Sequence, residues 1–234
     1  RGVVNMVQGP GSVIGQRLVT HPGIDVLSFT GSITTARTIA KLTVDRPELP
    51  TLLQCGGKGT ALVLDDAHLE RSVYEVMIGA FLTSGQRHNS TGRVIVTDRI
   101  YDRFVEALKE KTAQLSVGYG LDPEVFCGPV ISENLRTRYR RFGRSLLSKG
   151  HRAILPTATE KCSRRGFYVR PAIYEICWQT GSAVLEQEPP GPMLLVYRAS
   201  DWMEAVALHN QVQARIATSL FVSPDNPHLT DIRD

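Results

Sequence analysis

The sequence lacks features that mark several large classes of protein. No apolar run approaches the roughly 18 residues that a membrane-spanning helix needs, so a transmembrane helix is excluded. The chain also has no internal repeat and no low-complexity tract. Its four cysteines show neither a CxxC pair nor paired histidines at zinc-ligand spacing: Cys55, Cys127, Cys162 and Cys177. A zinc site and a disulfide framework are therefore both poorly supported, and this cysteine usage indicates a reducing cytoplasm.

Charge is modest and dispersed along the chain. The net charge is +4, and contents of 42% hydrophobic and 21% charged residues are typical of an ordinary soluble globular protein. The densest basic cluster, residues 135–152, carries its arginines around an otherwise helical segment, which favours a solvated helix surface over a nucleic-acid face. We therefore expect neither a nucleic acid nor a membrane as a partner. The 234 residues suffice for one large domain or two small ones.

Apolar segments alternate between strand and helix patterns along the whole chain. The clearest helix covers residues 67–85, where apolar side chains recur near helical spacing and Asp65 and Asp66 precede the first turn as capping candidates. Residues 3–8 have the apolar character of a strand. Such strand–helix alternation predicts an α/β fold with largely parallel sheets.

Glycines follow two successive strand-like segments. Gly9, Gly11 and Gly15 lie between the first predicted strand and a helix, and Gly31-Ser32 occupies the same place one unit later. Such glycines let a backbone approach phosphates at a helix N-terminus, although a plain tight turn explains either one alone. Two in succession favour a nucleotide site, because such sites lie at the carboxyl ends of parallel strands.

Three further stretches carry chemically informative residues. Gln54 ends a predicted strand and precedes the flexible pair Gly56-Gly57, which suggests a hinge. The turn "SGQRHNS" lies between a predicted helix and a predicted strand and presents the side chain of His88. This histidine could be a catalyst, a metal ligand, or a replacement that has removed an ancestral catalytic residue. Glu188 precedes a proline-rich stretch, which by itself indicates a rigid loop with an exposed carboxylate.

In this order, these fragments resemble motifs of the aldehyde dehydrogenase superfamily. The family's motifs GxGxxxG, FTGS, LELGGK, GQxC and EEIFGP correspond here to "GPGSVIG", "FTGS", "LQCGGK", "GQRH" and "QEPPGP". The segment "AFLTSGQR" is most similar to the branch that oxidises succinylglutamate semialdehyde. The resemblance implies an NAD(P)-dependent oxidoreductase that converts an aldehyde to a carboxylate. It also implies part of a Rossmann-type sheet in residues 1–55, the C-terminal half of the dinucleotide-binding domain. Residues 56–234 would form a catalytic-type α/β domain, incomplete at its C-terminal end.

Both catalytic positions implied by the resemblance are substituted. The family's nucleophilic cysteine falls on His88 and its general-base glutamate falls on Gln54, and these positions are 34 residues apart, as in the family. An imidazole adduct is cationic and a poor hydride donor, whereas a thiolate adduct surrenders hydride readily. Glutamine has no basic group, and loss of a general base alone costs roughly 10²–10⁴ in rate. The resemblance therefore implies a catalytically impaired protein.

The cofactor positions are better retained. Four residues match cofactor-binding positions of the family: Gly11, Gly31 and Ser32 near the pyrophosphate, and Glu188 at the nicotinamide ribose. Against this, Ala36 replaces the family's second glycine after "FTGS", and Pro190 replaces the aromatic residue near the nicotinamide. The resemblance implies NAD or NADP as the cofactor, with binding weakened or lost.

Three functions remain open at this point. The chain is an aldehyde dehydrogenase with residual activity on a small-molecule aldehyde, or a non-catalytic relative that serves as a ligand-binding or assembly module of a larger protein. The third is a metal or hydrolytic site centred on His88, although no second histidine or acidic ligand lies near it in the sequence. We expect the chain to be a piece of a longer cytoplasmic protein that forms a homo-oligomer in its full-length form.

Overall fold

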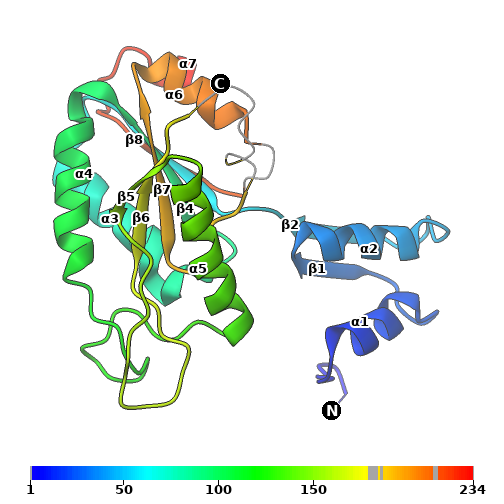
Figure 1. Cartoon of the computed structure of the whole chain (residues 1–234). Coiled ribbons are helices and arrows are strands. Elements are labelled where there is room, and N and C mark those ends of the chain that lie inside the picture. Colours follow the sequence, from blue (N-terminus) through cyan, green and yellow to red (C-terminus); the bar gives the residue numbers. More distant parts are fainter. Residues whose placement is uncertain (1, 179–183, 185–186, 213–215, 234) are drawn as a thin grey trace. The chain divides into compact units, whose positions relative to one another are not determined.

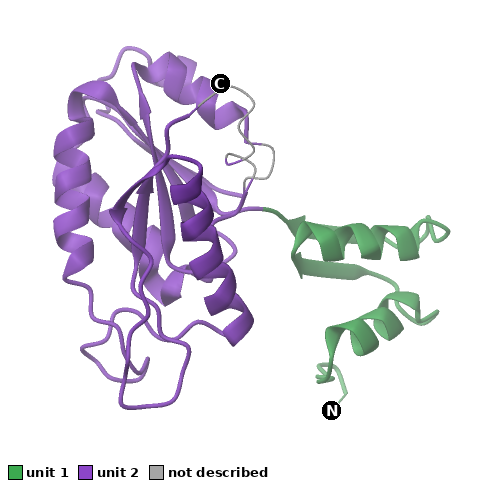
Figure 2. Ribbon diagram, viewed as in Figure 1, with its two compact units in different colours: residues 1–56 green, residues 57–234 purple. Residues whose placement is uncertain are grey.

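The computed structural model of the protein describes residues 2–178, 184, 187–212 and 216–233 (Figure 1). The chain divides into two compact units, Arg1–Gly56 and Gly57–Asp234, which Figure 2 colours separately. Strands and helices alternate in both units, so the predicted α/β fold class is confirmed. In the described part of the chain, no helix is both long enough and apolar enough to span a bilayer.

The first unit is a two-stranded parallel sheet with two helices. Its elements are α1 (Gly11–Thr20), β1 (Leu27–Gly31), α2 (Ile33–Thr43) and β2 (Thr51–Cys55). The parallel register places Gly31 beside Cys55 and Thr30 beside Gln54. The guanidinium of Arg46 donates to the carbonyls of Val19, His21 and Ile24, which ties the end of α1 to the loop before β2.

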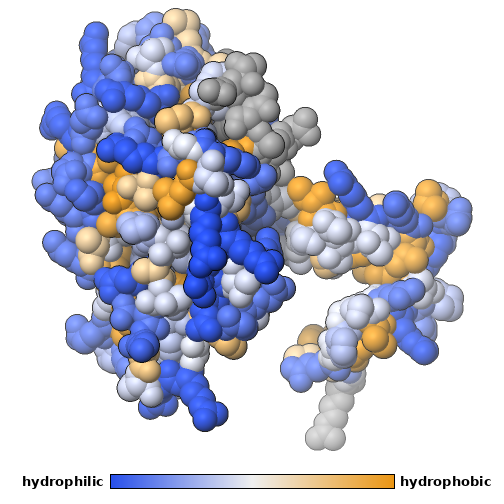
Figure 3. Space-filling view, in the orientation of Figure 1, coloured by the Kyte–Doolittle hydropathy of each residue, from blue (hydrophilic) through white to orange (hydrophobic). Residues whose placement is uncertain are grey.

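The strand predicted for residues 3–8 is absent, and these residues are exposed and irregular. Apolar character alone was a poor guide here, because a strand also needs a neighbouring strand to take up its backbone hydrogen bonds. Several apolar side chains of this unit are exposed, among them Val3, Val4, Met6, Val7 and Leu52. Figure 3 shows hydrophobic residues among the hydrophilic ones on the surface of this unit.

The second unit is a six-stranded sheet in the order β5-β6-β7-β4-β3-β8. Every neighbouring pair is parallel except β5 and β6, which are antiparallel. The strands are β3 (Gly59–Val63), β4 (Thr91–Thr97), β5 (Arg152–Leu155), β6 (Ala172–Glu175), β7 (Met193–Ala199) and β8 (Thr218–Phe221). The helices are α3 (Leu69–Phe81), α4 (Asp98–Ala113), α5 (Glu133–Ser148), α6 (Trp202–Asn210) and α7 (Leu229–Arg233).

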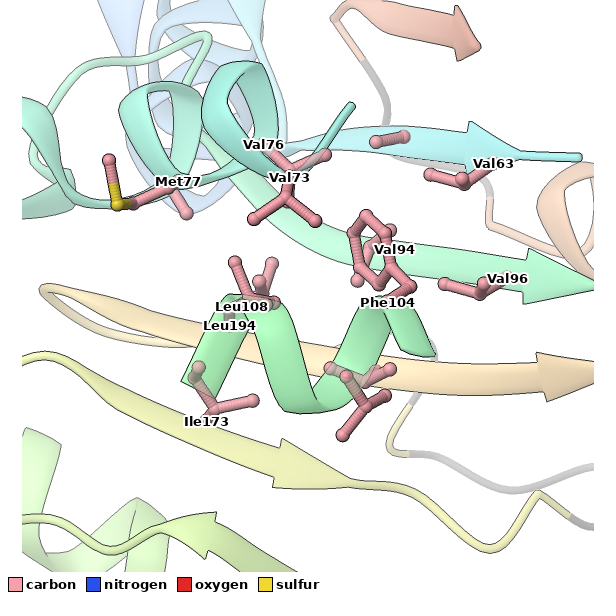
Figure 4. Packing of buried hydrophobic residues seen from close by; sticks show 14 of the residues in the cluster. Val63, Val73, Val76, Met77, Val94, Val96, Phe104, Leu108, Ile173 and Leu194 are labelled. Carbon is pink, nitrogen blue, oxygen red and sulfur yellow. The ribbon is translucent and has the colours of Figure 1, made fainter. Parts of the chain in front are cut away.

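Both faces of this sheet are covered, which explains its nearly continuous apolar strands. Val94 and Val96 of β4 belong to the core cluster formed with α3 and α4, whereas Ile95 belongs to the cluster formed with α5 and α6. Figure 4 shows Phe104 and Leu108 of α4 packed against side chains of the sheet. The alternation along β4 follows from the two-residue period of a strand.

The N-terminus of α3 is capped differently from the prediction. The ring nitrogen Nδ1 of His68 accepts the backbone N–H of Arg71 at 3.3 Å, so His68 and not Asp65 or Asp66 is the cap. The helix begins at Leu69, which leaves both acids too far upstream to cap it. Asp65 instead accepts the hydroxyl of Thr97. The spacing of apolar residues located the helix, but its cap depends on where the first turn begins.

Candidate functional site

The turn that carries His88 begins with an unusual backbone. After α3, the short 3-10 turn η1 (Leu82–Gly85) contains three consecutive residues in the left-handed region, Thr83 at φ 56°, Ser84 at φ 55° and Gly85 at φ 60°. The first two have side chains, for which this conformation is costly by roughly 1–2 kcal/mol each. Such strain persists only where the surrounding structure enforces it, and it concentrates at functional sites.

Two side-chain hydrogen bonds hold this backbone in place. The hydroxyl of Ser84 donates to the carbonyl of Gly128 at 2.7 Å. The side-chain carbonyl of Gln86 accepts the backbone N–H of Ile131 at 2.8 Å. These contacts fix the turn against the loop between α4 and α5. The side chains of Ser84 and Gln86 in the motif "SGQ" therefore have a structural role.

The far end of the turn is fixed as well. The hydroxyl of Ser90 accepts the backbone N–H of Arg87 at 3.1 Å, and the carbonyl of Ser90 accepts the N–H of Gly59 at 2.8 Å. His88 and Asn89 lie between these anchors with exposed side chains. The turn is therefore built to hold a backbone rigidly and to present the side chain of residue 88.

Among the described residues, the imidazole of His88 has no hydrogen-bond or ion-pair partner. A histidine that acts as a nucleophile or base is normally oriented by a third group. The part of the chain that the structure describes also contains no group of three or more histidine, cysteine, aspartate or glutamate side chains placed to hold a metal ion.

Gln54 lies near the end of β2, in the first unit, and its side chain is exposed. Its neighbour Cys55 is half-buried and follows it on the same strand, so the two side chains point to opposite faces of the sheet. The side chain of Cys55 therefore does not lie on the face of the sheet that carries the side chain of Gln54. His88 belongs to the second unit.

The first unit places its glycine turns at helix starts. Gly11 is the first residue of α1, and Ser32 caps α2 by accepting the N–H of Thr35 at 3.2 Å. Gly31 ends β1, and a Cβ there would lie 2.5 Å from the ring of Phe29. An apolar cleft of about 690 Å³ lies between α1, α2 and β1, lined in part by Gly11 and Phe29.

The second unit carries Glu188 in the segment before β7. Its carboxylate is exposed and lies with Pro190 beside two arginines of α5, Arg138 and Arg141, around a cleft of about 290 Å³. Gly11, Gly31 and Ser32 therefore share one unit, whereas Glu188 belongs to the other.

Two buried cations lie beside Glu188, and neither was singled out from the sequence. Lys58 is 3% exposed and Arg93 is 1% exposed. Burial lowers the pKa of Lys58 to about 7; the charge of Glu188 opposes this effect and that of Arg93 adds to it. Lys58 belongs to the motif "LQCGGK" and Arg93 to a predicted strand. The sequence signal for their burial was a basic residue beside mainly apolar neighbours.

Comparisons with known proteins point to one family. The model of the aldehyde dehydrogenase family matches residues 1–229. The α-ketoglutaric semialdehyde dehydrogenase of Bacillus subtilis is 34% identical over 226 residues, which are 94% of this chain and 45% of that protein. The crystal structure of an NADP-dependent glyceraldehyde-3-phosphate dehydrogenase from Bacillus halodurans, complexed with NADP, is 35% identical with a TM-score of 0.84. That match covers 97% of this chain and 45% of that one.

A third relative, the malonate-semialdehyde dehydrogenase of Bacillus velezensis, is 32% identical over 97% of this chain and 46% of its own length. The chain thus spans a little under half the length of the curated relatives that it matches.

Proposed function

This chain belongs to the aldehyde dehydrogenase family, and from that premise we propose that it is a catalytically impaired member of an NAD(P)-dependent oxidoreductase lineage. The reaction of the lineage would convert a small-molecule aldehyde, in the semialdehyde class of its relatives, to a carboxylate. His88 stands at the nucleophile position and Gln54 at the general-base position. The observation that carries the proposal is the exposed imidazole of His88, which has no partner in the described chain to orient or activate it.

The chemistry of the two side chains supports impairment at both steps. Hydride leaves most readily from an adduct that carries negative charge, which a thiolate supplies and a neutral imidazole does not. Hydrolysis of an acyl intermediate needs a base that removes a proton from water, and the amide of Gln54 cannot accept one. The backbone N–H of residue 88, in its rigid turn, would serve as an oxyanion donor.

Residues 1–55 are proposed as the C-terminal half of a dinucleotide-binding domain, and residues 56–234 as a catalytic-type α/β domain. Gly11, Gly31 and Ser32 would accommodate the pyrophosphate, and Glu188 would accept hydrogen bonds from the nicotinamide ribose. Gly11 at the start of α1 and Ser32 at the N-cap of α2 would let a phosphate approach the free backbone N–H groups of a helix N-terminus. When bound, NAD or NADP would supply the hydride acceptor.

The second candidate function is a non-catalytic ligand-binding or assembly module of a larger protein. The exposed apolar side chains of the first unit favour it, since unpaired apolar surface of this kind is normally covered by another chain segment or subunit. Assembly as a homo-oligomer would provide such a cover.

The test begins with cofactor binding. Calorimetry and fluorescence titration with NAD and NADP should show saturable binding to the wild-type protein. Glu188→Ala should weaken this binding because it removes the ribose acceptor. Glu110→Ala, at an exposed glutamate of α4, is the matched control and should leave it unchanged. An absence of heat and of any saturable fluorescence change at millimolar cofactor would leave the assembly module as the better account.

A further inference from the structure

The segment formed by residues 187–192, which carries Glu188, is held near both ends by buried cations. The ammonium of Lys58 donates to the carbonyl of Gly191 at 2.5 Å. The guanidinium of Arg93 donates to the carbonyl of Gln187 at 2.8 Å. A second Arg93 nitrogen donates to the carbonyl of Lys58 at 3.3 Å, so the two cations are joined to each other as well as to the segment.

The atoms around Lys58 and Gly191 are closely packed, and even an added Cβ at a neighbouring glycine would be too close to them. A Cβ at Gly92 would lie 2.6 Å from the Cβ of Lys58, and a Cβ at Gly85 would lie 2.4 Å from the carbonyl oxygen of Gly191. Gly191 has a φ of 60°, a conformation that suits glycine. Its carbonyl also accepts the N–H of Met193 at 2.9 Å, at the first residue of β7. The segment is thus fixed by the sheet, by the turn before His88 and by the two cations.

Burial of two neighbouring cations is an energetically unfavourable way to hold a loop. The free-energy cost of desolvating a charge often exceeds the electrostatic gain from its pairing, and well-packed apolar residues of similar volume often give an equally stable or more stable protein. The low pKa of Lys58, about 7, has the same cause. Clusters of perturbed groups of this kind are enriched at functional sites. Among the described residues, the charged groups acting on Lys58 are Glu188 from the segment and Arg93 from β4.

We propose that Lys58 and Arg93 are positioning residues, which hold residues 187–192 in the shape that presents the Glu188 carboxylate to the ribose of a bound dinucleotide. The cofactor part of this inference rests on the proposed function, whereas the anchoring of the segment stands independently of it. Neither cation touches the ligand; both act through backbone carbonyls that flank Glu188.

The experiment compares the wild-type protein with Lys58→Met, which keeps a long side chain and removes the charge and the donors. Hydrogen exchange reports on the segment through two hydrogen-bonded amides: that of Gln187, which donates to the carbonyl of Val184, and that of Met193, which donates to the carbonyl of Gly191. Lys149→Met, at an exposed lysine, is the matched control. Cofactor affinity is measured on the same three proteins across a pH series.

Loss of the anchor should speed exchange of the Gln187 and Met193 amides in Lys58→Met and weaken cofactor binding by roughly tenfold, the scale of one hydrogen bond to a charged group. In the wild type, protection corrected for intrinsic exchange should rise as the pH increases above about 7, because a solvated lysine titrates near 10.4 and the opened segment therefore binds the proton more readily than the anchored one. That pH step should be absent in Lys58→Met and retained in Lys149→Met.

The outcomes separate the two proposals. Unchanged exchange in Lys58→Met, or a wild type whose corrected protection is flat across this pH range, overturns the anchoring role. The wild-type pH series needs no substitution, so it decides the question even if the variant does not fold. A wild type that binds no dinucleotide removes the cofactor role and the proposed function together, while the exchange data still decide whether the cations hold the segment.

Discussion

Replacement of Gly85 by alanine tests how closely the His88 turn and the Glu188 segment are packed together. Gly85 has a φ of 60°, and a Cβ added there would lie 2.4 Å from the carbonyl oxygen of Gly191 and 2.8 Å from that of Ala80. Both neighbours are backbone atoms, so neither can move aside by changing a rotamer. Gly85→Ala must therefore shift either the turn or the segment.

The expected cost has two parts. The left-handed backbone of a residue with a Cβ costs roughly 1–2 kcal/mol. Forcing an extra methyl into a packed site typically adds about 1–3 kcal/mol. The free energy of unfolding should therefore fall by about 2–5 kcal/mol in Gly85→Ala.

Urea denaturation of Gly85→Ala beside Gly150→Ala separates these parts. Gly150 has a φ of 82° after α5, and a Cβ there would meet no atom within 4 Å, so this control carries the backbone cost alone. Gly85→Ala should lose more stability than Gly150→Ala by about 1–3 kcal/mol. Equal losses in the two variants would refute the close approach of Gly85 to Gly191.

Three further predictions follow from the second unit. Phe104→Ala should cost about 3–5 kcal/mol in urea denaturation because Phe104 is fully buried, whereas Tyr74→Ala at an exposed site should stay within about 0.5 kcal/mol; equal effects would contradict the assigned core. Asp201→Ala should cost about 0.5–2 kcal/mol by removing the acceptor of the Glu204 N–H, and a neutral result would mean that this cap of α6 does not form in solution. The pKa of Lys58 is lowered to about 7, whereas an unfolded lysine titrates near 10.4, so the unfolded chain binds more protons between these values. The free energy of unfolding should therefore rise with pH in this range, and an equal rise in Lys58→Met would contradict the assignment.

Much of the fold could be predicted because the spacing of apolar residues along the sequence reflects which side chains are buried. As expected from the sequence, the helix α2 (Ile33–Thr43) follows Gly31-Ser32, and Gln54 lies near the end of the strand β2 (Thr51–Cys55). The strand predicted for residues 3–8 was wrong because pairing depends on a neighbouring strand, which a local pattern does not reveal. The caps Asp65 and Asp66 were wrong because the start of α3 is set by the turn after β3.

The site could be predicted less completely. The resemblance to aldehyde dehydrogenase motifs placed Gln54 and His88 at the family's catalytic positions, and that assignment stays a prediction. Lys58 and Arg93 could not be singled out, since their importance arises from contacts with Gly191 and Gln187, more than 90 residues away in the sequence. A buried cation and an exposed one look alike in a sequence.

The most direct test of impairment at residue 88 is an aldehyde oxidation assay with NAD and NADP on the wild type, His88→Cys and His88→Cys/Gln54→Glu. The wild type should show no activity above background. His88→Cys should form covalent adducts with aldehydes or thiol reagents but turn over poorly, because Gln54 cannot activate the hydrolytic water.

Adding Gln54→Glu should raise turnover well beyond the sum of the single changes, because the two groups serve successive steps of one reaction. Gln54→Glu alone, which lacks the nucleophile, is the control and should remain inactive. Robust wild-type activity that survives His88→Ala would contradict the account, because another nucleophile would then carry the reaction.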